Sequence, residues 1–198
     1  MEIKYGNEYE ERTFENLKLS GELFKKYKFT GCRFINCSFE DCELNQCSFS
    51  SCVFEKCQII SLKANNDSQI QFTEFVSCQL IGINWEDLLP SGKFANPIKK
   101  MTGCILKYNT FSKINFRKFT FSSNEIYDSM FAECQLTESN FTSCKLDKTE
   151  FFKCNLQKSD FREANGYQID IMTCRMANAV FSFPEVINLL NGLGIQID

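Results

Sequence analysis

The cysteines of this chain are its most reactive side chains, and their spacing is regular. The chain has twelve cysteines, and six of them, from Cys32 to Cys57, fall at every fifth position of CRFINCSFEDCELNQCSFSSCVFEKC. Such thiols could bind a metal ion, form disulfides, act as nucleophiles or fill space in an apolar interior. The chain contains no histidine, which removes the commonest general base and excludes serine- or cysteine-histidine hydrolysis.

The composition is that of one globular domain or one elongated array. Of 198 residues, 43% are hydrophobic and 24% are charged, and the formal net charge of -3 indicates neither a nucleic-acid binder nor a polyacid. The start, MEIKYGNEYEERTF, lacks the apolar segment of a secretory signal, and no apolar run is long enough to span a bilayer. We therefore expect a cytoplasmic protein with reduced thiols and no membrane association.

A five-residue repeat runs through most of the chain. Each unit has a large residue at its centre, and the series changes phase through SLKANND and again across EDLLPSGKFANPIKK. Gly166 interrupts the last block. The centres are Phe14, Leu19, Phe24, Phe29, Phe34, Phe39, Leu44, Phe49, Phe54, Ile59, Ile70, Phe75, Leu80, Trp85, Met101, Leu106, Phe111, Phe116, Phe121, Ile126, Phe131, Leu136, Phe141, Leu146, Phe151, Leu156, Phe161, Ile171, Met176 and Phe181.

A small residue lies two positions before most centres. All twelve cysteines occupy this position, and in the last block it also holds Ser129, Ser139, Thr149, Ser159, Ala164 and Ala179. A period of five fits neither an α-helix nor a flat strand, but a spacing of two within each unit places the small and large residues on one face of an extended chain. Short extended pieces joined by regular corners satisfy both facts, and stacking them buries the large side chains along one axis, as in a solenoid.

Units such as CSFED, CSFSS, CKLDK and SDFRE closely resemble those of the pentapeptide-repeat family. The resemblance covers roughly residues 9–181 and implies an all-β fold, a right-handed quadrilateral β-helix with four repeats in each coil. Residues twenty apart would then lie one above another at about 4.8 Å, so Lys113 and Lys153 would flank Glu133, and Lys118 and Lys158 would flank Glu138.

The repeat divides the chain into two parts. Residues 1–181 form the predicted β-helix, which is interrupted near residues 60–69 and by a loop at about 86–100. Residues 182–198 form a C-terminal helix and tail. In that tail Ser182 can cap the helix, Pro184 can occupy its first turn, and Gly192 can end it.

The solenoid favours one role for the cysteines. Even spacing around a coil sends successive thiols to different sides and so does not assemble a metal site, and the expected compartment disfavours disulfides between stacked pairs such as Cys32 and Cys52. We therefore interpret the thiols as small apolar fillers between rings of phenylalanine and leucine. Outward carboxylates such as Asp160 and Glu163 are best explained as a solvated surface, so the sequence predicts no catalytic, metal or cofactor site.

Solenoid proteins commonly bind their partners where the repeat is interrupted, and the segment GINWEDLLPSGKFANPIKK (82–100) is such an interruption. Two interpretations stay open for it: a corner insertion with its apolar residues packed on the coil below, or a projecting loop that contacts a partner. The candidate partner contacts are Trp85, Leu88, Leu89, Lys93, Phe94, Lys99 and Lys100.

The charge around this segment is uneven. Seven basic residues and no acidic residue lie between Leu88 and Asn124: Lys93, Lys99, Lys100, Lys107, Lys113, Arg117 and Lys118. The repeat distributes them over several faces of the coil, which favours a solvated, partly paired surface over a phosphate groove. An anionic partner remains the alternative.

The last segment, SFPEVINLLNGLGIQID, leaves an apolar face near the end of the rod. A terminal coil must cover its open edge or pair it with another subunit, so we expect head-to-head homodimerisation. The candidate dimer contacts are Leu189, Leu190, Leu193, Ile195 and Ile197.

This ending and GINWEDLLPSGKF also resemble the quinolone-resistance (Qnr) and microcin-immunity branch of the pentapeptide-repeat family. That resemblance implies a non-catalytic homodimer that acts on DNA gyrase or topoisomerase IV, without binding nucleic acid itself. The alternative is a structural scaffold that binds another cytoplasmic protein or an anionic partner.

Overall fold

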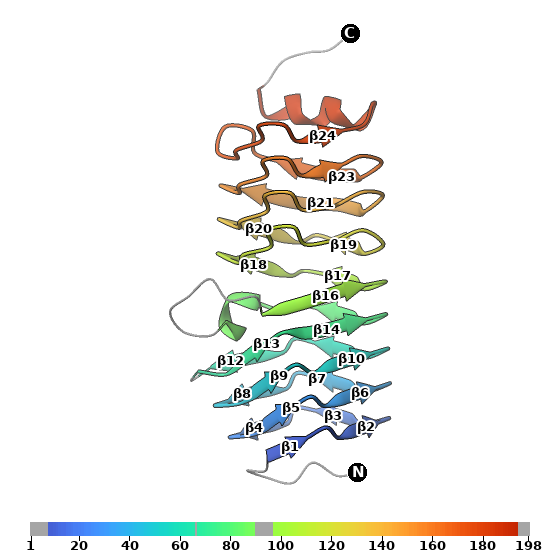
Figure 1. Cartoon of the computed structure of the whole chain (residues 1–198), viewed down its shortest axis with the longest axis vertical. Helices are drawn as coiled ribbons and strands as arrows, with labels where there is room; N and C mark the ends of the chain where they lie inside the picture. Colours follow the sequence, from blue (N-terminus) through green and yellow to red (C-terminus); the bar gives the residue numbers. More distant parts are fainter. Residues whose placement is uncertain (1–7, 66, 90–96, 194–198) are drawn as a thin grey trace.

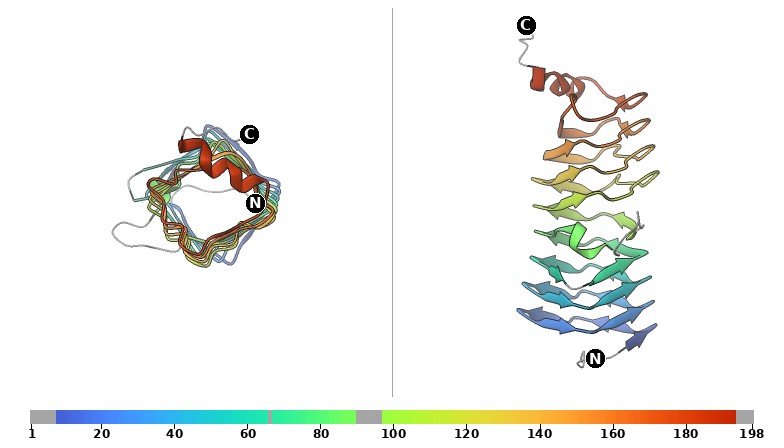
Figure 2. Two further views of the ribbon diagram at one scale, coloured as in Figure 1. Left: turned by 90° about the horizontal axis from the view of Figure 1, so that it is seen from above. Right: turned by 90° about the vertical axis from the view of Figure 1, so that its left-hand side faces the viewer.

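The computed structural model describes residues 8–65, 67–89 and 97–193. The chain forms a rod of about eight stacked coils, with β1 at one end and the helix η2 at the other (Figure 1). Seen along the axis, the coils superpose on a four-sided outline (Figure 2). The predicted quadrilateral β-helix is confirmed.

Strands of one face pair in parallel along the rod, and we name the four faces A to D in chain order. Face A carries β1 (Glu8–Glu10), β5 (Lys28–Thr30), β9 (Ser48–Ser50) and β13 (Gln69–Gln71). Face B carries β2 (Thr13–Glu15), β6 (Arg33–Ile35), β10 (Val53–Glu55), β14 (Thr73–Val76), β16 (Ile98–Thr102), β22 (Asp160–Phe161) and β24 (Val180–Phe181).

Faces C and D share the longest strands. Face C carries β3 (Lys18–Ser20), β7 (Ser38–Glu40), β11 (Gln58–Ile60), β15 (Gln79–Ile81), β17 (Ile105–Lys107) and β19 (Glu125–Tyr127). Face D carries β4 (Leu23–Lys25), β8 (Glu43–Asn45), β12 (Lys63–Asn65), the 3-10 helix η1 (Trp85–Leu88), β18 (Thr110–Ser112) and β20 (Met130–Ala132). The strands β21 (Lys145–Phe152) and β23 (Asn165–Ile169) run from face C to face D, and η2 (Glu185–Leu193) follows β24.

The register between coils gives the number of repeats in each coil. Phe29 pairs with Phe49, so four five-residue units complete one coil. Across the first interruption Ile59 pairs with Leu80, which places one extra residue between β12 and β13. Across the second, Leu80 pairs with Leu106, which is six residues more than a regular coil.

The large central residues fill the interior in ordered stacks. Along face B the rings of Phe121, Phe141 and Phe161 are parallel, with centroids 4.6 and 4.7 Å apart. Around a coil the rings meet edge to face, as Phe131 and Phe141 do at an interplanar angle of 88°. Offset-stacked and edge-to-face contacts are both favourable geometries for aromatic pairs. The four-sided coil therefore uses both directions of aromatic contact.

The corner residue lies two positions after most centres and adopts a left-handed conformation. Asn36 has φ 53° and Lys118 has φ 59°, values that cost a residue with a Cβ about 1 kcal/mol or more. The hydrogen bonds between coils offset this cost: Asn36 N–H donates to Glu55 O at 3.0 Å on the following coil, and Arg33 N–H donates to Arg12 O at 2.8 Å on the preceding coil. Each coil is thus bonded to both of its neighbours.

The corners differ between the two halves of the rod. After residue 115, corners that follow faces A and B close with a hydrogen-bonded turn, as where Phe119 N–H donates to Phe116 O at 3.0 Å and Asn124 N–H donates to Phe121 O at 3.2 Å. In the earlier half the corresponding corners continue directly from one strand to the next. The change from open to closed corners occurs across the coil that contains the second interruption.

The structure corrects two details of the sequence prediction. The centre assigned to Ile171 is instead filled by Ile169, which is buried and pairs with Phe151. The chain takes this shorter path because Tyr167 replaces the missing centre at Gly166. The Ser182 hydroxyl accepts a hydrogen bond from Glu163 N–H at 3.1 Å and so ties the helix to the coil below, rather than serving as the predicted cap.

The predicted charge ladders form only in part. Lys118 Nζ lies 3.5 Å from Glu138 Oε2, as expected, but Lys113 Nζ pairs with Glu86 Oε1 of η1 at 3.1 Å in place of Glu133. These pairs are exposed to solvent, so they contribute little to stability. No helix in the described residues is long and apolar enough to cross a membrane.

Removing one ring from a stack tests the interior packing. Phe141→Ala should lower the free energy of unfolding by about 3–5 kcal/mol, because it opens a cavity between Phe121 and Phe161. Cys144→Ser should cost less, because Cys144 Sγ donates to Phe121 O at 2.9 Å and a serine hydroxyl can keep that bond. Equilibrium urea denaturation measures both changes, and small, equal effects would contradict the inward assignment.

Candidate interaction surfaces

The thiols occupy interior positions. All twelve cysteines are buried and free, and their sulfurs face backbone carbonyls one coil below, as where Cys57 Sγ donates to Phe34 O at 3.2 Å. Burial raises the pKa of Cys52 and of Cys144 to about 12. Within the described residues, no group of three or more histidine, cysteine, aspartate or glutamate side chains could hold a metal ion. This is the environment of an interior filler, so the thiols do not form an interaction surface.

The structure places two predicted contact residues in the core. Trp85 is 1% exposed and Leu88 is 2% exposed, because η1 replaces the strand of face D in this coil and turns both side chains inward. Trp85 stacks on Phe111 at 5.5 Å, and its Nε1 donates to Asn109 Oδ1 at 3.0 Å. Burial therefore removes these two from any surface that a partner could contact in this structure.

The other predicted contacts of this segment lie farther along. Leu89 is half-buried against the core, whereas Lys99 and Lys100 are exposed on β16. Lys93 and Phe94 lie outside the described residues. Two interpretations of the 82–100 segment were open. The part that forms η1 is an insertion packed on the core, whereas Lys99 and Lys100, later in the segment, are exposed on face B.

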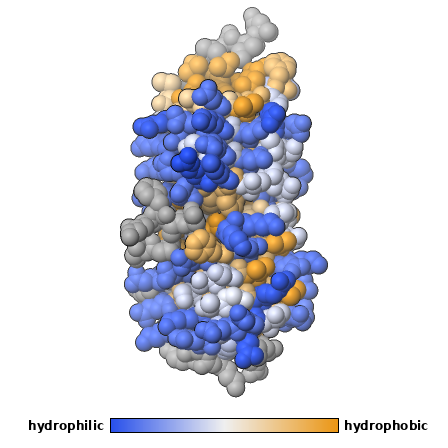
Figure 3. All heavy atoms as spheres, viewed as in Figure 1, coloured by the Kyte–Doolittle hydropathy of each residue, from blue (hydrophilic) through white to orange (hydrophobic). Residues whose placement is uncertain are grey.

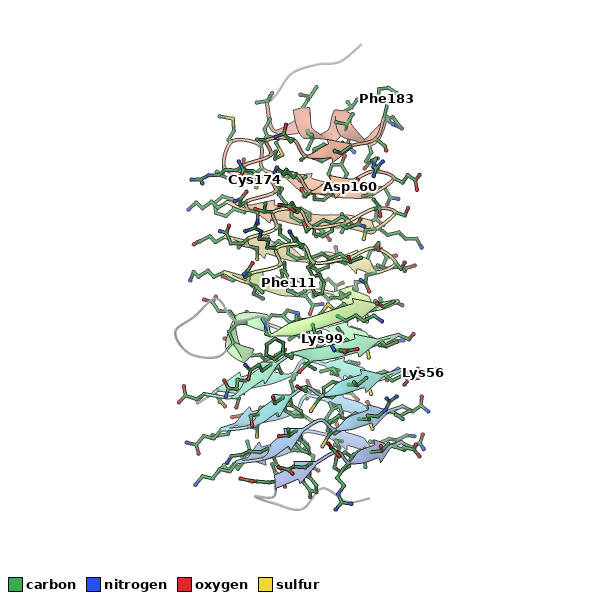
Figure 4. All side chains as sticks on the ribbon, in the orientation of Figure 1. Lys56, Lys99, Phe111, Asp160, Cys174 and Phe183 are labelled. Atoms are coloured by element: carbon green, nitrogen blue, oxygen red, sulfur yellow. The ribbon has the colours of Figure 1, made fainter. Side chains whose placement is uncertain are left out.

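A groove of about 540 Å³ lies at the corner between faces A and B, beside β16. Three successive levels of the rod contribute to it: the corner at Phe72, the start of β16, and the closed turn at 116–119. Its charged lining residues are Glu74, Lys99, Lys100, Arg117 and Lys118. Figure 4 labels Lys99 at this level of the rod.

Only part of the basic segment reaches this groove. The register brings Lys99 and Lys100 together with Arg117 and Lys118, whereas Lys107 lies on face C. We expected the basic residues to be spread over several faces, and the four-residue cluster was missed because the six additional residues of the coil hide the alignment. The exposure of Phe72 was also missed, because it occupies a corner position rather than a centre.

A second groove, of about 1160 Å³, lies at the opposite corner, between faces C and D. It forms because β23 pairs with β21 two residues short of a full coil after Gly166, where Glu150 pairs with Gln168. Its lining includes three carboxylates and one lysine: Asp147, Glu150, Asp170 and Lys148. The two grooves therefore have opposite charge.

The floor of this acidic groove contains an unusual tyrosine. Tyr167 is 2% exposed and packs edge-on against Phe161 at 5.5 Å, and its hydroxyl has no hydrogen-bond partner within the described part of the chain. Burial raises the pKa of Tyr167 to about 12, so the phenol stays neutral at physiological pH. The aromatic ring replaces the missing centre of this coil.

The C-terminal end of the rod is apolar on its outer surface (Figure 3). Among the predicted dimer contacts, Leu189 packs against the core, Leu190 is half-buried, and Leu193 is 46% exposed. Ile195 and Ile197 lie outside the described residues. Phe183 is 79% exposed and projects at this end (Figure 4), and the sequence analysis did not select it.

Comparison with known proteins identifies the repeat. The family model described as "Pentapeptide repeats" matches residues 28–60 and 131–165 in eight copies. No curated protein matches the chain.

Solved structures of repeat proteins are similar at low identity. Full-length QnrB1, described as a plasmid-mediated fluoroquinolone resistance protein, is 19% identical over 92% of this chain and 100% of its own, with a TM-score of 0.39. HetL, a pentapeptide repeat protein involved in heterocyst differentiation regulation from the cyanobacterium Nostoc sp. strain PCC 7120, is 9% identical over 88% of this chain and 87% of its own, with a TM-score of 0.35. Similarity at this level carries no argument for a shared partner.

Gly166 offers a test of the shortened corner. A Cβ on this residue would lie 2.6 Å from Asp147 Cα, so Gly166→Ala should lower the free energy of unfolding by roughly 1–3 kcal/mol more than a matched change elsewhere. The matched change is Gly21→Ala, where φ is also left-handed and a Cβ would meet nothing within 4 Å. Urea denaturation compares the two, and equal losses would show that the close approach to Asp147 does not matter.

Proposed function

The chain is a pentapeptide-repeat protein, and from this premise we propose that it is a non-catalytic interaction protein that binds DNA gyrase or topoisomerase IV. Pentapeptide-repeat proteins are typically structural or interaction proteins rather than enzymes. The observation that carries the proposal is that the thiols and most phenyl rings are buried in the interior. Their burial leaves the corners and the irregular segments as the surfaces that can contact a partner.

The identity of the partner rests on the sequence of those irregular segments. GINWEDLLPSGKF and the C-terminal ending resemble the Qnr and microcin-immunity branch, whose members act on type II topoisomerases. In this proposal the protein works in the cytoplasm and protects the topoisomerase from inhibitors. The contact surface comprises the exposed lysines of β16 and outward residues of neighbouring coils, and the predicted contacts Lys93 and Phe94 remain part of the proposal.

Charge argues against simple mimicry of duplex DNA. A mimic needs a dense acidic surface, because the enzyme's DNA-binding surface recognises the regular negative charge of a phosphate backbone. This chain has a net charge of only -3, and its middle coils carry a basic groove. Binding through the irregular segment is the form of the proposal that fits this distribution.

The second candidate function is a scaffold for another cytoplasmic protein or for an anionic partner. The basic groove between faces A and B favours it, because such a surface attracts a partner of opposite charge. A pull-down that recovers a specific partner other than a topoisomerase would favour this alternative over the first.

A supercoiling assay tests the topoisomerase proposal. In the presence of ciprofloxacin, the protein at about micromolar concentration should restore or inhibit supercoiling by gyrase. The pair Lys99→Glu and Lys100→Glu should weaken that effect about tenfold, because it reverses the charge of the proposed contact. Lys25→Glu with Lys26→Glu is the matched control, since both lysines are exposed on a different corner. No effect of the unaltered protein on either topoisomerase would end the proposal.

The apolar C-terminal end supports a further part of the proposal, a homodimer formed end to end. Leu190→Asp with Leu193→Asp should convert a dimer of twice 23.0 kDa into a monomer, because it places charge in the contact. Light scattering coupled to size-exclusion chromatography measures the mass, and Leu23→Asp near the other end is the control. An unaltered protein that elutes as a monomer at all concentrations would contradict the dimer.

A further inference from the structure

The basic groove between faces A and B is a built feature of the rod. It lies where open corners give way to closed ones, and three successive levels of the rod line it. β16 adds a bulge: Thr73 pairs with Ile98, but Glu74 pairs with Lys100, which leaves Lys99 as an extra residue. Bulges re-aim side chains and are frequent beside functional sites.

The charges of this groove are only partly neutralised. Lys99 Nζ lies 2.7 Å from Glu74 Oε1, and Arg117 and Lys118 lie 3.7 and 3.5 Å from the two oxygens of Glu138. Within the described residues, no ion pair involves Lys100. Four cations against these two carboxylates leave a local charge of about +2, on a chain whose net charge is -3.

Aromatic side chains lie among these cations. Phe72 is 46% exposed at the corner of the lowest level. Phe119 is half-buried and is held by Phe121, with ring centroids 4.6 Å apart. The groove therefore offers an ordered apolar platform with positive charge around it.

We propose that this groove binds an acidic segment of a protein partner that carries a large apolar side chain. The apolar side chain packs on Phe72 and Phe119, and flanking carboxylates meet Lys100, Arg117 and Lys118. Aromatic anchors surrounded by charge are typical of the residues that dominate binding energy. This inference rests on the proposed role as an interaction protein, but not on a topoisomerase as the partner.

The same features disfavour nucleic acid as the occupant. Glu74 and Glu138 border the cations and would repel a phosphate backbone, and the net negative charge of the chain opposes a long polyanion. A peptide segment needs only a few carboxylates and can direct its apolar side chain at the platform. The groove volume of about 540 Å³ is also within the usual range for ligand sites, roughly 300–1,000 Å³.

A fluorescein-labelled peptide, Glu-Asp-Phe-Asp-Glu flanked by glycines, is the probe. Fluorescence anisotropy with the full chain should give saturable binding that weakens as sodium chloride rises from about 50 to about 300 mM. Lys100→Glu with Arg117→Glu should weaken binding at least about tenfold, and Phe72→Ser should weaken it severalfold without altering the charge. The same peptide with alanine in place of phenylalanine should bind more weakly than the parent.

Two controls keep the result specific. Lys25→Glu with Lys26→Glu changes the net charge equally at another corner and should leave binding unchanged, and circular dichroism checks that each variant is folded. A single-stranded thymidine oligonucleotide that binds the groove more tightly than the peptide would overturn the proposal, as would a peptide affinity equal in all variants or no saturable binding. Because no topoisomerase is present, failure here is distinguishable from failure of the supercoiling assay.

Discussion

The structure depends on parallel pairing in register, which places each large apolar residue on its counterpart one coil away. Phe34 stacks on Phe54 at 4.7 Å because both occupy the same point of a twenty-residue coil, and a slip of one residue would turn these rings outward. The left-handed corners are the cost of this arrangement, and the hydrogen bonds that each corner makes to the next coil hold them. Any change in the number of residues in a coil must therefore be accommodated at a corner.

That constraint explains where the surface becomes distinctive. The six additional residues around η1 accompany the change of corner type and the bulge at Lys99, and together these form the basic groove. The two-residue shortening after Gly166 forms the acidic groove at the diagonally opposite corner. Both grooves arise where the repeat departs from its five-residue period. The outward positions of the regular coils hold mostly polar side chains. We infer that recognition follows the irregularities of the rod.

The sequence predicted the fold because each repeat is a local rule applied many times, and the small and large positions that it assigned are buried almost throughout. It predicted the surface less well. Trp85 occupies a centre of the repeat and is buried like the other centres, so its selection as a candidate partner contact was misleading. The cluster of Lys100 with Arg117 and Lys118 depends on how many residues the irregular coil contains, and no local pattern gives that number. Ile169 replaced Ile171 because only the packed coil shows how the chain compensates for Gly166.

The central claim is that thiols and phenyl rings together fill the axis of a stacked square coil. Counting reactive thiols with Ellman's reagent tests it directly, because a thiol buried in a packed interior does not meet the reagent. The account predicts almost no rapid reaction in the native protein and twelve reactive thiols after unfolding in guanidinium chloride. Several thiols that react in the native protein at the rate of free cysteine, or fewer than twelve after unfolding, would contradict it.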